Sequence, residues 1–167
     1  MVSFKAKAIT PNIPTNPKSF ANDIRRAAKL TSQQIKRDFE KTVRTWTKKP
    51  EFVVSQKKIG NSYTFVAYTD NQIYIYVNDG TKPHTIRAKN VPNLVFSYPT
   101  TAKTTPRVLG SKSGSRGSKW ATVPSVQHPG TEARKFDEII QKRFKDRWQK
   151  EANRILRNYL DKQVKPR

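Results

Sequence analysis

The sequence contains no cysteine, only two histidines, and 12 acidic residues against 34 basic ones. Without cysteine, the chain has no disulfide, no thiolate metal site and no thiol nucleophile. No uncharged apolar run approaches the length of about 18 residues that a membrane span needs. The N-terminal residues also lack the apolar core of a secretion signal. We therefore expect a soluble protein, made inside a cell, that does not span a membrane.

The excess of basic residues gives the 167-residue chain a formal net charge of +22. A charge of this size makes an anionic partner the first one to consider. The cations are unevenly distributed, because residues 100–119 hold five basic and no acidic side chains, whereas residues 120–131 hold no charge at all. The length suits one domain with arms better than two domains.

The first half of the chain is predicted to hold an arm and a long helix. Residues 1–15 include Pro11 and Pro14 and are predicted to be an extended arm. Asn16-Pro17 then has the residues of a helix start, and Lys48-Lys49-Pro50 those of a helix end. Apolar residues recur between them at helical spacing: Phe20, Ile24, Ala28, Ile35, Phe39, Val43 and Trp46.

The rest of the chain is predicted to hold strands and a second long helix. Alternating, β-branched and aromatic residues favour strands at 51–57, 63–69, 73–77, 94–98 and 120–126, and a short extended piece at 83–87. The last helix runs from Phe136 to Tyr159. The fold class is therefore α+β, with one antiparallel sheet of four to five strands packed against two long helices. Residues 16–167 are expected to form a single domain with a long inserted loop at 99–119.

Five aromatic residues have the regular helix or strand spacing that is typical of core positions: Trp46, Tyr63, Tyr74, Tyr76 and Trp148. We predict that they pack in the core and do not stack on nucleic-acid bases.

The sequence contains few residues that could catalyse a reaction. His84 and His128 would suit a small basic nuclease, in which one imidazole accepts a proton and the other donates one. No carboxylate is placed by the sequence to orient either ring, so structural roles in turns are favoured. No metal-binding, phosphate-loop or nucleophile-elbow motif is present. We predict that the protein is not an enzyme and takes no cofactor or metal.

The loop at 99–119 is rich in Ser, Thr, Gly, Lys and Arg and is nearly free of apolar residues. Such a loop resembles the arms that hold phosphates without reading bases. Its candidate contacts with DNA or an acidic partner are Lys103, Arg107, Lys112, Arg116 and Lys119. Non-specific nucleic-acid binding is therefore an alternative function, and solubilising charge is the simplest explanation of these cations.

Two turns carry a resemblance to a known family. The first is a G-T-x-P-H-x-I turn and the second a V-x-H-P-G-T turn ahead of the last helix; together they contain Gly80, Thr81, Pro83, His84, His128, Pro129, Gly130 and Thr131. In this order, behind a long N-terminal helix, they resemble the tail-completion or neck proteins of long-tailed bacteriophages. Outside these turns, only the pattern of elements agrees. The family usually has a glutamate two residues before the Gly-Thr pair, where this chain has Asn78.

The resemblance implies a structural component of the virion, made in the host bacterial cytoplasm. It implies a homo-oligomer, a hexameric ring at the head-proximal end of the tail. The implied partners are the head connector or stopper and the tail terminator or tail tube proteins, with packaged double-stranded DNA as a further partner of the basic loop. Gly80 and Gly130 are predicted to have positive φ angles that hold the two turns in shape.

Overall fold

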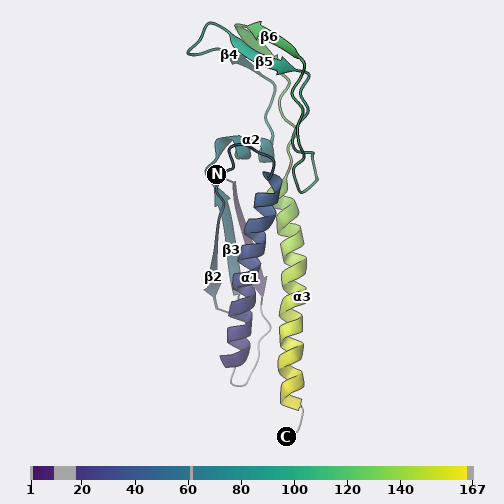
Figure 1. Ribbon diagram of the computed structural model, residues 1–167. Coiled ribbons are helices and arrows are strands. Elements are labelled where there is room, and N and C mark those ends of the chain that lie inside the picture. Colours follow the sequence, from purple (N-terminus) through teal and green to yellow (C-terminus); the bar gives the residue numbers. More distant parts are fainter. Residues whose placement is uncertain (1, 10–17, 61, 165–167) are drawn as a thin grey trace. The chain divides into compact units, whose positions relative to one another are not determined.

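The structure is a computed structural model that describes residues 2–9, 18–60 and 62–164 (Figure 1). It has α+β architecture, which confirms the predicted class. The chain separates into two compact units, where the sequence predicted a single domain over 16–167. Unit 1 comprises Met1–Glu40, Glu51–Thr69 and Asp137–Arg167, and unit 2 comprises Lys41–Pro50 and Asp70–Phe136.

Unit 1 contains a three-stranded antiparallel sheet in the order β1-β3-β2. Its strands are β1 (Val2–Ile9), β2 (Val53–Ile59) and β3 (Ser62–Thr69). β1 replaces the described part of the arm predicted over residues 1–15, and it pairs with β3 along its whole length. The alternation of apolar and polar residues in V-S-F-K-A-K-A was the signal for this strand. Residues 10–15 of the predicted arm lie outside the described residues.

Two long helices accompany this sheet: α1 (Lys18–Thr42) and α3 (Phe136–Val164). The predicted start of α1 at Asn16-Pro17 lies outside the described residues. α1 ends at Thr42 instead of continuing to Lys49, because the chain closes into a turn in which the Trp46 amide donates to the Val43 carbonyl at 2.9 Å.

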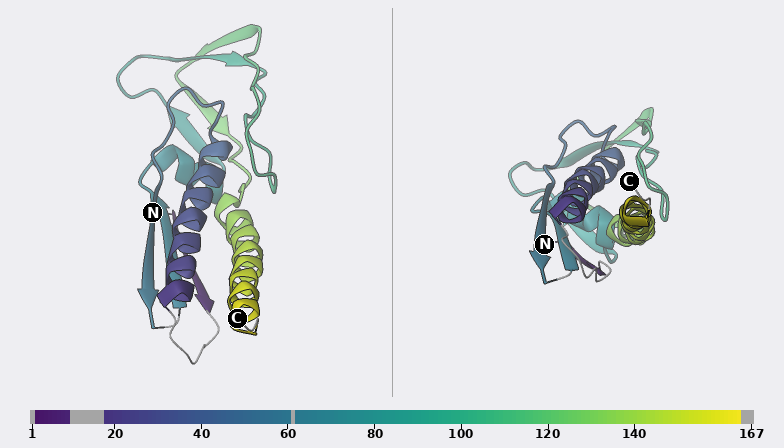
Figure 2. Two further views of the ribbon diagram at one scale, coloured as in Figure 1. Left: turned by 60° about the horizontal axis from the view of Figure 1, so that its bottom comes forward. Right: turned by 90° about the horizontal axis from the view of Figure 1, so that it is seen from below.

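In unit 1, both helices lie on the same face of the sheet (Figures 1 and 2). Phe65 of β3 packs against Trp148 of α3, with ring centroids 5.4 Å apart. Gln56 of β2 pairs with Phe65 in the register, so its side chain is on the same face, where its amide oxygen accepts from the Ser32 hydroxyl of α1 at 3.0 Å. The core between these layers is aromatic and aliphatic, and it includes Phe20, Ile24, Ile35, Phe39, Phe52, Tyr63, Phe65, Ile140, Phe144, Trp148, Ile155 and Tyr159.

Unit 2 contains helix α2 (Gln72–Asp79), where the sequence predicted a strand at 73–77. Asn71 caps this helix, because its side-chain oxygen accepts from the Tyr74 amide at 2.9 Å. The unbroken apolar run I-Y-I-Y-V has no clear period of its own, and helical spacing buries Tyr74 and Asn78 on one face. The local cap and this buried face favour a helix over a strand.

Unit 2 also holds two separate two-stranded antiparallel ribbons. One pairs β4 (His84–Arg87) with β7 (Ser125–His128), and the other pairs β5 (Leu94–Tyr98) with β6 (Lys119–Val123). The prediction of one sheet with four to five strands is therefore wrong for the described part of the chain. The predicted strand 120–126 is divided at Pro124, which has no amide hydrogen for a ladder, so its two halves join different ribbons.

The predicted aromatic core is partly confirmed. Tyr63, Tyr74 and Trp148 are buried, and Trp46 is half-buried, with its ring tilted by 54° to that of Tyr74 and the centroids 6.2 Å apart. Tyr76 is 52% exposed, so its assignment to the core was wrong. Strand alternation would put Tyr76 on the same face as Tyr74, whereas in helix α2 the buried face holds Tyr74 and Asn78.

Candidate functional site: the paired motif turns

The two turns that carry the family resemblance lie directly beside one another in unit 2. Thr81 and Thr131 form an antiparallel bridge, in which each amide donates to the other's carbonyl, at 2.9 Å and 3.1 Å. The β4–β7 register continues this pairing and places His84 opposite His128. The bridged threonines are 50 residues apart in sequence and the paired histidines 44, and the structure joins the two turns into one backbone cluster, which we call the turn pair (residues 80–87 and 125–131).

Two glycines allow the turns to approach this closely. Gly80 has φ +79°, and a Cβ atom there would lie 2.7 Å from the Thr131 carbonyl oxygen. Gly130 has φ +91°, and a Cβ atom there would lie 2.3 Å from the Thr81 carbonyl oxygen. The prediction of positive φ at both positions is confirmed. The close approach of two backbones is a second reason for glycine that the sequence did not indicate.

Asn78, at the position where the family usually has glutamate, connects α2 to the start of α3. It is fully buried, and its side-chain oxygen accepts from the Phe136 amide at 2.8 Å. Its backbone carbonyl accepts from the amides of Arg134 and Lys135 at 3.1 Å and 3.0 Å. A neutral amide therefore caps the first turn of α3 without burying a charge.

His84 and His128 are brought together, with ring centroids 5.1 Å apart. The His84 Nδ1 atom donates to the Lys82 carbonyl at 2.8 Å, because a carbonyl can only accept. The His128 Nδ1 atom accepts from the Gly130 amide at 3.0 Å. In the neutral state, the two rings thus have opposite tautomers, with a free Nε2 lone pair on His84 and an Nε2–H on His128.

The described residues contain no group of three or more His, Asp or Glu side chains that could hold a metal ion. Two imidazoles of opposite tautomer are, however, the combination that proton transfer to and from a phosphoester requires. The structure thus supplies the proximity on which the nuclease alternative depends. The remaining turn residues, Pro83 and Pro129, are exposed and lie at the same end of the β4–β7 ribbon, next to His84 and His128.

The loop at 99–119 has no helix or strand apart from Lys119 at the start of β6, but its own hydrogen bonds hold it in unit 2. The Lys112 amide donates to the Lys103 carbonyl at 2.8 Å, and the Thr45 hydroxyl donates to the Lys112 carbonyl at 2.9 Å. Lys103 is half-buried, and its Nζ donates to the Thr45 carbonyl at 3.2 Å, which gives it a structural role. The other candidate contacts of the loop are exposed: Arg107, Lys112, Arg116 and Lys119.

The β5–β6 ribbon carries an exposed apolar face. Val95 and Trp120 are 63% and 65% exposed. In the register Val95 opposes Thr122 and Trp120 opposes Ser97, so all four side chains lie on the same face of the ribbon. A tryptophan exposed to this degree at a diagonal from an exposed valine is typical of an interaction surface.

Three of these features could not be identified from the sequence. Trp120 was predicted only as part of a strand, and nothing in a single sequence tells an inward from an outward tryptophan on a short ribbon. Asn78 was noted only as a departure from the family pattern. Arg134 carried no motif, but it is 8% exposed and lies beside the turn pair.

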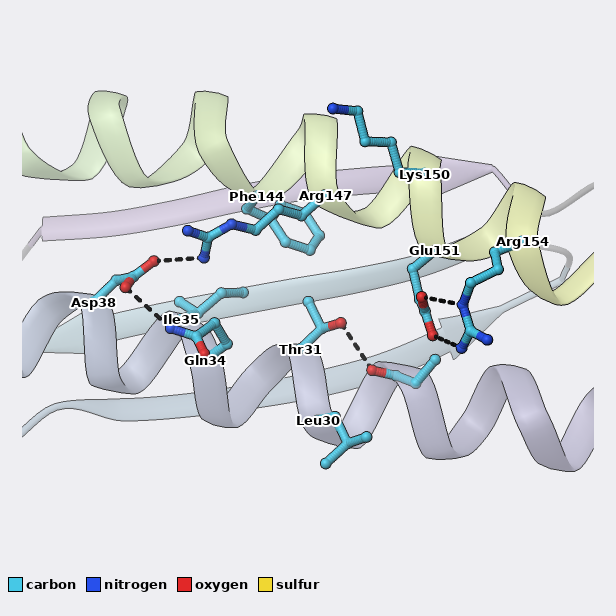
Figure 3. Close-up of a pocket in the computed structure, with 11 residues that line it drawn as sticks. Leu30, Thr31, Gln34, Ile35, Asp38, Phe144, Arg147, Lys150, Glu151 and Arg154 are labelled. Carbon is cyan, nitrogen blue, oxygen red and sulfur yellow. Dashed lines mark hydrogen bonds and ion pairs between the residues drawn. The ribbon is translucent and has the colours of Figure 1, made fainter.

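Unit 1 contains a groove of about 530 Å³ between α1 and α3 (Figure 3). At one end, the buried Asp38 carboxylate accepts from Arg147 at 3.1 Å and from Gln34 at 3.1 Å. At the other end, Arg154 donates to both carboxylate oxygens of Glu151, at 2.9 Å and 2.6 Å (Figure 3). Both carboxylates of the groove are therefore engaged by arginines, which suits a structural surface better than acid–base chemistry.

The Glu151–Arg154 pair predicts a small pH dependence of stability. The hydrogen bond from Arg154 lowers the pKa of Glu151 below its ordinary value of 4.5. A lowered folded-state pKa stabilises the fold above the ordinary value, and this contribution is lost as the pH falls through the lowered pKa. The pair is partly exposed, so we expect Glu151→Gln to reduce the free energy of unfolding at pH 7 by at most about 0.5 kcal/mol. Urea denaturation should show this difference at neutral pH, and the difference should shrink as the pH falls below the ordinary pKa of Glu151; a difference that grows on acidification would contradict it.

None of the helices within the described ranges has an apolar stretch sufficient to cross a bilayer. Comparison of the chain with protein-family models, with curated proteins and with solved structures finds no match.

Proposed function

We propose that this protein is a structural assembly subunit that closes with copies of itself into a ring in the neck of a long-tailed bacteriophage. In this role it completes the head-proximal end of the tail and joins it to the head connector, without catalysing a reaction. The virus and the position in the particle come from the resemblance of the two turns. The structure supports only the more general proposal that the chain assembles with other subunits.

The exposed face of the β5–β6 ribbon is the observation that carries this proposal. A two-stranded ribbon is marginally stable alone, and an exposed strand edge pairs readily with another chain. Within the described residues, each strand of the two ribbons pairs along one edge only. Copies arranged in a ring would cover Val95 and Trp120 on each subunit and offset the cost of ordering the ribbons.

The experiment that tests this function is removal of the protein from the virus that encodes it. A neck subunit that is missing should leave DNA-filled heads and complete tails that do not join. Electron microscopy of the lysate would show the two populations separately, and adding the purified protein should restore joined particles. Normal joined particles made without the protein would contradict the proposal.

The charge supports a second, electrostatic part of the proposal. A ring of subunits at +22 each would repel itself unless an anion lies in or beside it. Packaged DNA in the channel is such an anion. The exposed loop cations Arg107, Lys112, Arg116 and Lys119 are the candidate contacts, whereas Lys103 is already bonded to Thr45.

Changing the four exposed loop cations to glutamine should weaken DNA binding and flatten its salt dependence. Each phosphate contact that is lost reduces the slope of log affinity against log salt by about 0.9. We expect a reduction of about 2 to 4 in this slope, measured by fluorescence anisotropy with a duplex oligonucleotide at several salt concentrations. A matched control removes the same charge from exposed lysines of unit 1: Lys57, Lys58, Lys142 and Lys145. Equal slopes for the two variants would contradict a specific role for the loop.

The contact between His84 and His128 favours a small basic nuclease as the second candidate function. In that reaction, His84 Nε2 would accept a proton from the attacking hydroxyl, and His128 Nε2–H would donate one to the leaving oxygen. Purified protein incubated with RNA and DNA separates the two functions. Cleavage that is lost in both His84→Ala and His128→Ala would support the nuclease, and no cleavage above that of the double variant supports the assembly subunit.

A further inference from the structure

Arg134 is a buried cation without a carboxylate partner. Arg134 is 8% exposed, and its guanidinium forms no ion pair with any described carboxylate. Its Nε donates to the Thr104 hydroxyl at 3.1 Å and its Nη1 to the Glu132 carbonyl at 2.9 Å. A guanidinium has five N–H donors, so three remain without a described acceptor. A largely buried cation that keeps donors unused is stabilised by an anion placed against it.

A cavity of about 320 Å³ in unit 2 lies against Arg134. Lys48 and Lys103 line it as well, and no Asp or Glu of the described residues does. Its walls include the apolar side chains of Ile73 and Val77. Three cations without an acid, beside partly apolar walls, give this cavity a charge of one sign that favours an anion.

A second donor without a hydrogen-bond partner also favours an anion in this cavity. The indole Nε1–H of Trp46 is buried and has no hydrogen-bond partner, and Trp46 lines the cavity. Lys103 uses one of its three N–H donors on the Thr45 carbonyl. The cavity is thus lined by four side chains that carry N–H donors, Trp46, Lys48, Lys103 and Arg134, and an oxyanion is the group that can accept from several such donors.

We propose that this cavity is a binding site for a phosphate-type oxyanion, held by the Arg134 guanidinium and closed by the Trp46 indole. Three cations match the charge of a phosphate better than the single charge of a carboxylate, and guanidinium binds phosphate in a bidentate fork. The ligand is either free phosphate or a phosphate of nucleic acid, which share this chemistry. Arg134 also lines a second cavity, together with His128, Lys112 and the exposed Glu132; the acidic residue makes this cavity the weaker anion site.

This inference does not depend on ring formation, and calorimetry with inorganic phosphate in a chloride buffer tests it. We expect saturable binding with one site per chain, and an affinity at least about tenfold weaker in Arg134→Gln, because a charged hydrogen-bonding group is lost. Trp46→Phe removes only the N–H donor and should weaken binding about threefold. This variant keeps the test valid if Arg134→Gln fails to fold.

Adjacent lysines provide a matched control. Lys48 lines the cavity and Lys49 does not, although both are exposed. Lys48→Gln should weaken phosphate binding, and Lys49→Gln should leave it unchanged. Competition by a duplex oligonucleotide would identify nucleic acid as the source of the phosphate, and its absence would identify free phosphate. No saturable binding up to about 20 mM phosphate, equal effects of the two lysine variants, or tighter binding of a glutamate-rich peptide than of phosphate would each overturn the proposal.

Discussion

Gly130→Ala is expected to destabilise the protein by about 3 kcal/mol or more, through loss of the turn pair. Two costs combine at this residue. The φ angle of +91° is one that L side chains rarely adopt, and the new Cβ would lie 2.3 Å from the Thr81 carbonyl oxygen. Because that oxygen accepts the Thr131 amide, relief of the overlap requires the bridge between the turns to open. Urea denaturation and hydrogen exchange of the Thr81 and Thr131 amides would measure both effects.

Gly60→Ala separates these two costs. Gly60 also has a positive φ, +56°, but a Cβ atom there would have nothing within 4 Å. We therefore expect this variant to lose only about 1 kcal/mol, the cost of the backbone conformation alone. Equal losses in Gly60→Ala and Gly130→Ala would show that the close approach of the two turns contributes nothing to stability.

Trp120→Ser is expected to dissociate the proposed ring while each subunit stays folded. Tryptophans at interfaces commonly contribute 2 kcal/mol or more, so about 2 kcal/mol lost at each contact weakens each by about 30-fold. The side chain is 65% exposed in the subunit, so its removal leaves no cavity in the core. Sedimentation would follow the change in mass, and circular dichroism would show an unchanged fold.

The matched control for this variant is Ile59→Ser. Ile59 is 58% exposed on β2, which belongs to unit 1, whereas the ribbons belong to unit 2. The Ile59→Ser variant should assemble like the unaltered protein. Iodide quenching provides a further measurement, because Trp148 is buried and Trp46 is half-buried, so exposed tryptophan fluorescence arises chiefly from Trp120. Quenching should fall when the subunits assemble.

The elements with a strong local signal were predictable from the sequence. β5 has the predicted bounds, and β3 differs by one residue, because turn residues flank their apolar pattern. α2 was missed because an unbroken apolar run fits a strand or a helix, and the cap by Asn71 decides between them. The grouping of strands into three sheets was not predictable, since alternation gives the faces of a strand and not its neighbour.

The candidate site was predictable in its parts and not in its arrangement. The residues of both turns and the positive φ angles of their glycines came from turn chemistry and the family resemblance. The bridge from Thr81 to Thr131 depends on a fold that returns the chain across 50 residues, and no local signal encodes it. Arg134 is one of 34 basic residues, and only burial distinguishes it.

The mass of the purified full-length protein in solution tests the central claim most directly. Sedimentation combined with negative-stain electron microscopy, at concentrations around 10 μM and in moderate salt with DNA present to neutralise the charge, would give both the mass and the shape. We expect a closed ring of identical subunits, with hexamers as the size that the family resemblance implies. A monomer under all of these conditions would contradict assembly as the function of this protein.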